Sequence, residues 1–165
     1  MATGSLVSVH EYLSTSYRPD CDYVDGVVLE RNLGEKDHSL LQTEIAFYYR
    51  SRRKEWGLWA LVEQRVQVSA TRFRIPDVCL LIGEPQDQIV RTPPFICIEV
   101  LSPDDRLSEM RQRVEDYLAF GVPYVWIVDP ATRHAWRCTA GGMEEVTELR
   151  TENPETLVPV CDLFE

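Results

Sequence analysis

The chain has 165 residues, of which 44% are hydrophobic and 27% charged, and its formal net charge is −10. This length and composition predict a single soluble domain over residues 1–165 with its own core. No apolar run approaches the ~20 residues of a membrane helix, and Met1–Ser5 lacks the start of a secretion signal, so a cytoplasmic location is expected. The negative charge argues against strong non-specific nucleic-acid binding by a lone protomer, although a local basic patch or a metal-assisted site is compatible with it.

Five cysteines lie far apart in the sequence, and no two of them form a Cys-x-x-Cys pair. Their odd number and wide spacing argue against a structural zinc site. Two of them lie in apolar runs, where a thiol acts as a small hydrophobic side chain. We expect all five to be reduced structural residues: Cys21, Cys79, Cys97, Cys138 and Cys161.

The first third of the chain predicts a helix, a hairpin and a longer second helix. Ser8-Val-His-Glu11 fits a capping box and begins a helix that runs to about residue 17. Asp25-Gly26 suits a tight primed turn and predicts a hairpin over residues 23–29. Asp37 can cap a helix that runs to about residue 55, in which apolar residues recur at helical spacing: Leu40, Leu41, Ile45 and Tyr48.

Strand patterns dominate the rest of the chain, and a third helix interrupts them. This helix is predicted over residues 103–120, and its apolar stripe comprises Leu107, Met110, Val114, Tyr117 and Leu118. Strands are predicted over residues 58–62, 63–69, 74–82, 95–101 and 124–129, with two weaker ones near 134–139 and 144–149. The order of elements predicts a mixed α/β domain whose sheet is backed by helices.

Two of these apolar strands carry a carboxylate: Asp77 lies in the run 74–82, and Glu99 lies in the run 95–103. If the runs pair as antiparallel neighbours with residue 77 opposite residue 99, the two Cβ atoms lie ~5 Å apart on one face. Two carboxylates at that distance repel unless a cation joins them or one takes a proton. A magnesium or manganese ion bound to both carboxylates would remove this repulsion. Metals held by carboxylates activate water in many nucleases.

A structural interpretation of the same pair stays open. Asp77 follows a proline at the mouth of its strand and can hydrogen-bond a turn. Glu99 can pair with an arginine from the third helix, since structural ion pairs also occupy such places.

Motifs in a fixed order and spacing link the chain to a known family. They are Tyr23-Val-Asp-Gly26, His38, Pro76-Asp77, Glu99-Val-Leu-Ser-Pro103 and Gly121-Val-x-x-x-Trp-Ile-Val-Asp-Pro130. This set resembles the Uma-type restriction endonuclease family, a bacterial family within the PD-(D/E)XK nuclease superfamily. The resemblance implies a restriction-endonuclease-like core, with a mixed central sheet flanked by helices and an N-terminal helix and hairpin. It also implies that Asp77 and Glu99 are the metal-binding carboxylates.

The resemblance is incomplete at the lysine of the superfamily signature, which lies two residues beyond the second acid. Leu101 occupies that position here. In the Uma-type family the lysine moves to the following helix, four residues before a tyrosine, and Arg113 takes this place before Tyr117. Arginine can steady charge on a phosphate, but its high pKa prevents it from exchanging a proton readily. Helical geometry puts Arg113 at the border of the apolar stripe, within reach of the sheet, and a surface ion pair with Glu109 is the alternative.

Three further residues are candidates for lining the site. His38 matches a recurrent histidine of the family, and it is otherwise a partly exposed residue at the start of a helix. Glu44 and Glu63 can add a carboxylate, because superfamily members often do so, although each also fits a solvated glutamate. The basic run Arg50–Lys54 can meet a phosphate backbone, and a solvated helix end is its alternative.

Two functional hypotheses follow from these residues. The first is a metal-dependent DNA endonuclease in which Asp77 and Glu99 hold magnesium and Arg113 replaces the usual lysine. The second is a nuclease-fold protein with impaired catalysis that serves as a nucleic-acid-binding or assembly module. A homodimer is expected in either case, since four Trp and seven Tyr can supply an aromatic interface.

Overall fold

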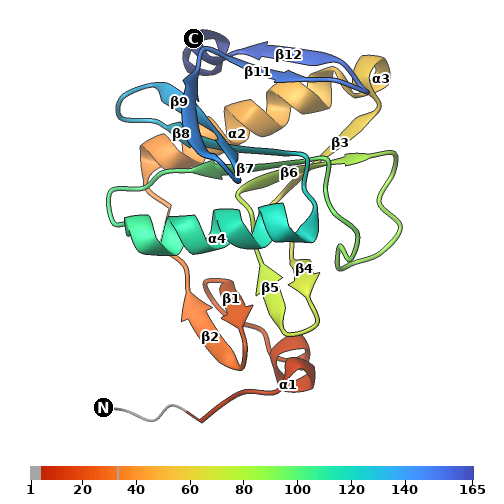
Figure 1. Cartoon of the computed structure of the whole chain (residues 1–165), viewed down its shortest axis with the longest axis vertical. Helices are drawn as coiled ribbons and strands as arrows, with labels where there is room; N and C mark the ends of the chain where they lie inside the picture. Colours follow the sequence, from red (N-terminus) through yellow and green to blue (C-terminus); the bar gives the residue numbers. More distant parts are fainter. Residues whose placement is uncertain (1–4, 33) are drawn as a thin grey trace.

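A mixed six-stranded sheet forms the centre of the computed structural model, which describes residues 5–32 and 34–165. Strands β7 and β8 are parallel, and all other neighbours in the order β10-β9-β8-β7-β6-β3 are antiparallel. Helix α2 lies on one face of the sheet and helix α4 on the other (Figure 1). The bounds are β3 Leu58–Val62, β6 Val78–Ile82, β7 Ile96–Val100, β8 Tyr124–Asp129, β9 His134–Thr139, β10 Gly142–Val146, α2 Lys36–Ser51 and α4 Leu107–Phe120.

The two helices cover opposite faces because side chains alternate along the central strands. Val78 and Ile98 pack in the core cluster that includes Ile45 of α2. Cys79 and Cys97 pack in the cluster that includes the apolar stripe of α4. Both faces of β7 and of the first three residues of β6 are therefore buried, which is why these strands are apolar in the sequence.

A second, smaller sheet lies on the far side of α4 from the central sheet (Figure 1). It has the order β2-β1-β5-β4, and α1 packs against it through Tyr12. Its bounds are α1 Val9–Ser14, β1 Cys21–Val24, β2 Val27–Glu30, β4 Val66–Ser69 and β5 Arg72–Arg74. The predicted N-terminal helix and hairpin are thus confirmed, with the Ser8 hydroxyl accepting from the Glu11 N–H at 3.1 Å, and the helix ends three residues earlier than expected.

Several predicted boundaries are wrong for local reasons. Helix α2 begins at Lys36 and has no side-chain cap, so Asp37 is not its cap. The helix is interrupted at Arg52, and a separate single turn, α3 (Arg53–Trp56), follows and ends at Gly57, which has a left-handed conformation. Helix α4 begins at residue 107 rather than 103, with Arg106 in extended conformation as its N-cap residue, and Leu107 is 71% exposed rather than part of a buried stripe.

The C-terminal region contains more structure than the sequence pattern predicted. The weak strand expected over residues 144–149 is the junction of two strands, β10 and β11. Strand β11 (Glu148–Thr151) pairs with β12 (Thr156–Pro159), and a short 3-10 helix η1 (Val160–Phe164) follows. The hairpin and η1 lie against α2 (Figure 1), and the hairpin residues Leu149 and Val158 and the η1 residue Leu163 are buried in the α2 core cluster.

The structure bears on two further predictions, which concern membrane-spanning helices and the state of the cysteines. None of the helices within residues 5–32 and 34–165 is long and apolar enough to cross a membrane. All five cysteines are free thiols. Residues 1–4, which belong to the stretch expected to lack a secretion signal, lie outside the described part of the chain.

Candidate active site

The strand register places Asp77 opposite Glu99. The pairs Val78 with Ile98 and Cys79 with Cys97 define an antiparallel register that continues to residues 77 and 99. The side chains of both acids therefore point to the face of the sheet that α4 covers. Asp77 Oδ2 accepts a hydrogen bond from the N–H of Val100 at 2.8 Å. Asp77 is only 3% exposed and Glu99 is 0% exposed.

Three side chains from the N-terminal half hold Asp77 in place. Arg31, which follows β2, donates from Nη2 to Asp77 Oδ1 at 2.8 Å. His38, in the first turn of α2, places Nε2 3.4 Å from Asp77 Oδ2. One turn later, Gln42 donates to the backbone carbonyl of Asp77 at 2.9 Å. The start of α2 is therefore fixed to the mouth of β6 by polar contacts.

Helix α4 supplies the partners of Glu99. The Tyr117 hydroxyl donates to Glu99 Oε1 at 2.5 Å. Arg113 lies one turn earlier and places Nη1 3.7 Å from Glu99 Oε2, too far for a hydrogen bond. Glu99 Oε2 is buried and has no hydrogen-bond partner among the described residues. Arg113 thus points toward the sheet, as its helical position predicted, rather than pairing with Glu109 at the surface.

The surroundings shift the pKa values of the two carboxyl groups in opposite directions. Burial and the neighbouring charge of Asp77 raise the pKa of Glu99 to about 8, in spite of Arg113 and the Tyr117 hydrogen bond. Burial also works to raise the pKa of Asp77, but the His38 contact and the Arg31 charge outweigh it and keep that pKa below its ordinary value. The contact with Asp77 raises the pKa of His38. Without a further cation, the pair at neutral pH therefore consists of an ionised Asp77 and a protonated Glu99.

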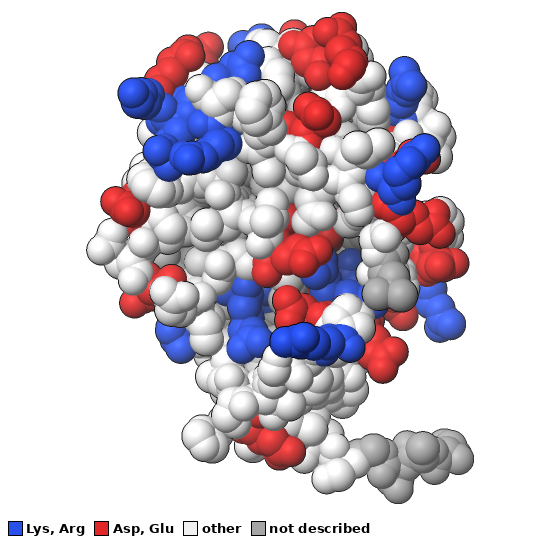
Figure 2. Space-filling view, turned by 180° about the vertical axis from the view of Figure 1, so that it is seen from behind, with Lys and Arg blue, Asp and Glu red and all other residues white. Residues whose placement is uncertain are grey.

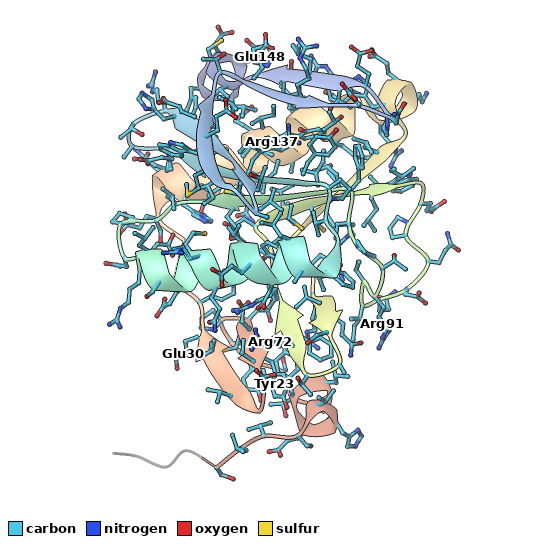
Figure 3. The ribbon with its side chains drawn as sticks, in the orientation of Figure 1. Tyr23, Glu30, Arg72, Arg91, Arg137 and Glu148 are labelled. Carbon is cyan, nitrogen blue, oxygen red and sulfur yellow. The ribbon has the colours of Figure 1, made fainter. Side chains whose placement is uncertain are left out.

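A network of buried ion pairs joins the site to the smaller sheet. Asp22 of β1 lies 3.5 Å from Arg113 Nε and 3.0 Å from Arg74 Nη1. Arg74 also lies 2.7 Å from Asp116 of α4, which in turn pairs with Arg72. Figure 3 shows Arg72 between α4 and the tip of the smaller sheet. These charges fix α4, and with it Arg113, relative to β1 and β5.

We expect Arg74→Ala to lower the free energy of unfolding by about 3–5 kcal/mol, because it removes a cation that two buried carboxylates share. Urea denaturation followed by circular dichroism measures this change. The exposed Arg150 provides the matched control, and Arg150→Ala should cost less than about 1 kcal/mol. Equal losses in the two variants would contradict a structural role for the network.

The structure separates the predicted site residues into two groups. Asp77, Glu99, Arg113 and His38 lie together, while Leu101 lines an apolar groove of about 640 Å³ between α4 and β9–β10.

The two additional acids point elsewhere. Glu44 is exposed and borders a groove formed with residues 130–133 and the C-terminus, because it lies on the side of α2 turned away from Gln42. The Glu63 side chain is also exposed at a turn after β3, and only its N–H approaches the site, donating to the Asp77 carbonyl at 3.2 Å.

Sequence reasoning missed Arg31, Gln42 and Asp22 as members of this site. Arg31 and Asp22 belong to the hairpin, and nothing in the local pattern connects the hairpin with strands that lie more than forty residues further along the chain. Gln42 gives the one usable signal: it lies one helical turn after His38 and so shares its face of the helix.

The side chains around Asp77 and Glu99 agree with the binding of a small, hard cation in one respect and disagree with it in another. Within residues 5–32 and 34–165, no three His, Cys, Asp or Glu side chains converge in a way that would hold a metal. Magnesium, however, usually binds one or two carboxylates and completes its shell with water and substrate phosphate. The unpartnered Glu99 Oε2 and the facing Asp77 supply such a pair. Arg31 occupies Asp77 Oδ1, so the ion would take that oxygen only if the guanidinium moved.

One solved structure shares the fold of almost the whole chain. It is a putative nuclease belonging to DUF820 from Anabaena variabilis ATCC 29413, at 22% identity and a TM-score of 0.81, with 96% of this chain and 97% of that chain covered. A DrdV–DNA complex matches 78% of this chain and 12% of that chain at 19% identity, and its TM-score of 0.39 is too low to carry an argument. The restriction-endonuclease-like fold predicted from the sequence is confirmed.

The family comparison covers nearly the same part of the chain. A search of curated proteins gave no match. The family model Uma2, described as "Putative restriction endonuclease", matches residues 9–165. Since this match includes every element from α1 to η1, the chain belongs to the Uma2 family of restriction-endonuclease-like proteins.

Proposed function

We propose that the protein is a metal-dependent endonuclease that hydrolyses phosphodiester bonds in DNA, and that Asp77 and Glu99 hold a magnesium or manganese ion. The observation that carries this proposal is the buried carboxylate pair, in which the register places Glu99 opposite Asp77, and Glu99 Oε2 has no hydrogen-bond partner among the described residues. A purely structural pair would be expected to satisfy that oxygen. Family membership supports nuclease chemistry of this class.

Each side chain of the site has a role that follows from its contacts. A bound ion would lower the pKa of its water and steady charge on the scissile phosphate. Tyr117 orients Glu99, and His38 and the Val100 N–H orient Asp77. Arg113 brings a permanent positive charge beside Glu99, where it can stabilise negative charge that develops on a phosphate. It does not serve as a proton donor, because its pKa is too high.

Incubation with supercoiled plasmid and with single-stranded DNA, in magnesium or manganese, tests the proposal. The protein should nick or cut DNA in either metal, and EDTA should stop the reaction. Asp77→Ala should abolish cleavage, while Asp87→Ala, at an exposed loop position, should retain it. Absence of cleavage, or cleavage that survives Asp77→Ala, would contradict the proposal.

A binding or assembly module without catalysis is the second candidate, and two observations favour it: Arg31 neutralises Asp77 directly, and arginine stands where the family has lysine. Titration of metal while the melting temperature is followed separates the candidates, because an ion that binds only the folded protein raises that temperature. The metal-ion proposal requires a rise that Asp77→Ala removes. A rise that persists in this variant would place the ion elsewhere.

Arg113→Lys should increase the cleavage rate about tenfold or more, because lysine restores a cation able to exchange a proton beside Glu99. Single-turnover cleavage of a labelled duplex measures this rate. Arg111→Lys, at an exposed position two residues earlier on α4, is the control and should leave the rate unchanged. If cleavage is undetectable before and after Arg113→Lys, the binding function gains support.

We also propose that the protein is a homodimer and that it is located in the cytoplasm. A dimer would let two sites cut both strands of a duplex. Light scattering coupled to size-exclusion chromatography tests it, and a monomer at micromolar concentration would contradict it.

A further inference from the structure

A compact group of cations lies where α2 ends and α3 begins, at the far end of α2 from the site. It contains four of the chain's 17 Lys and Arg residues within five positions, although the whole chain carries 27 Asp and Glu. Figure 2 shows Lys and Arg side chains gathered at this corner of the molecule, at the upper left. Within residues 5–32 and 34–165, none of the four forms an ion pair. We call Arg50, Arg52, Arg53 and Lys54, with Tyr48, Trp56 and Trp59, the basic aromatic patch.

Aromatic rings hold two of these guanidinium groups in place. Arg52 lies 3.7 Å from the centroid of the Tyr48 ring, and Arg53 lies 4.1 Å from that of Trp59. A guanidinium that stacks on a ring can still donate from its edges to an oxyanion. Arg52 already uses Nη1 to donate to the Tyr48 carbonyl at 3.3 Å and to Ser51 Oγ at 3.2 Å, which further fixes its orientation. Both arginines are half-buried, while Arg50 and Lys54 are exposed beside them. The patch therefore combines oriented and exposed cations on one part of the surface, which is the electrostatic pattern that suits a phosphate backbone.

Helix α2 connects the patch to the candidate active site. His38, in the first turn of α2, lies beside Asp77, and the helix ends thirteen residues later at Ser51, next to Arg52 and Arg53. At a rise of about 1.5 Å per residue these thirteen residues span roughly 20 Å, which corresponds to about six base pairs of duplex DNA. A duplex that enters the site can therefore place a more distant part of its backbone over the patch.

We propose that the basic aromatic patch binds backbone phosphates of duplex DNA, several base pairs from the bond presented to Asp77 and Glu99. The choice of DNA rests on the proposed function, while the patch itself rests on its unpaired cations and stacked rings. Four cations within five positions give this corner a local positive charge, in a chain whose formal net charge is −10. A solvated helix end, at which cations merely complement the helix dipole, is the competing interpretation.

Fluorescence anisotropy with a labelled 30-base-pair duplex in EDTA tests the proposal. The triple variant Arg50→Gln, Arg53→Gln, Lys54→Gln should bind at least ~10-fold more weakly, and the slope of log K against log salt should fall by up to about 3. The control triple Arg91→Gln, Arg111→Gln, Arg133→Gln changes the net charge equally at exposed positions that form no ion pair with any described residue, and Arg91 lies away from α3 (Figure 3). The control should change the affinity less than about twofold.

The outcomes separate the patch from the catalytic proposal. Equal weakening in both triples, an unchanged patch triple, or no binding by the unaltered protein overturns the patch. Binding that depends on the patch, without cleavage in magnesium or manganese, supports the patch and rejects the nuclease. Circular dichroism melting of both triples must match that of the unaltered protein, because α3 contributes only one turn to the fold.

Discussion

In EDTA, the stability of the Glu99→Gln protein is expected to change little between about pH 5 and pH 8, while that of the unaltered protein falls. The folded protein holds a proton on Glu99 up to a pKa of about 8, whereas the unfolded chain releases it near the ordinary value of 4.5. Between these values the folded state binds more protons, so its free energy of unfolding falls by up to about 1.4 kcal/mol per pH unit. Glutamine reproduces the protonated form and removes this dependence. Urea unfolding at several pH values measures the difference.

His38 and Asp77 set the remaining pH dependence of this variant. The raised pKa of His38 adds stability that is full below about pH 6.5 and is lost as the pH rises through its folded value. The lowered pKa of Asp77 adds stability that is lost only as the pH falls below its ordinary value of 3.8, outside the tested range. Glu99→Gln should therefore keep a small decline. Glu109→Gln, at an exposed position of α4, should decline like the unaltered protein, whereas a flat profile in the unaltered protein would mean that Glu99 is ionised throughout.

The same proton couples stability to metal binding. A cation at the pair favours ionised Glu99, so its binding below about pH 8 must expel the proton. A rise in melting temperature caused by magnesium should therefore be larger at pH 8 than at pH 6. Glu99→Gln should lose cleavage while gaining stability at pH 8, because glutamine removes a metal ligand and also removes the cost of ionising a buried carboxyl beside Asp77.

The sequence predicted the core of the site because strand periodicity contains most of its geometry. Two apolar runs, each with one carboxylate, suggested that the runs pair with residue 77 opposite residue 99, and the strand register confirms this pairing. Helical spacing was sufficient to turn Arg113 toward the sheet. These arguments depend only on periods of 2 and 3.6 residues, which hold wherever an element is regular.

The site residues that the sequence did not predict contact the site through tertiary packing, which no sequence periodicity describes. Arg31 reaches Asp77 across forty-six positions, and its place depends on how the hairpin packs beneath α4. The same holds for Asp22, whose buried partners Arg74 and Arg113 lie on two other elements. Glu63 was a candidate because it begins an alternating pattern, but a left-handed turn directs its side chain to solvent. Tertiary packing thus decided which charged residues reached the site.

Arg31→Gln is expected to lower the melting temperature in EDTA and to enlarge the rise that magnesium causes. The guanidinium is the closest cation to Asp77, at 2.8 Å, and its loss leaves that carboxylate buried with His38 and the Val100 N–H, at a cost of about 3–5 kcal/mol. The same loss frees Oδ1 for an ion that the guanidinium otherwise competes with. Differential scanning fluorimetry across a magnesium titration measures both effects, and Arg91→Gln is the exposed control. A variant that is destabilised but responds to magnesium no more than the unaltered protein would show that Arg31 does not compete with an ion, and that the pair serves the fold alone.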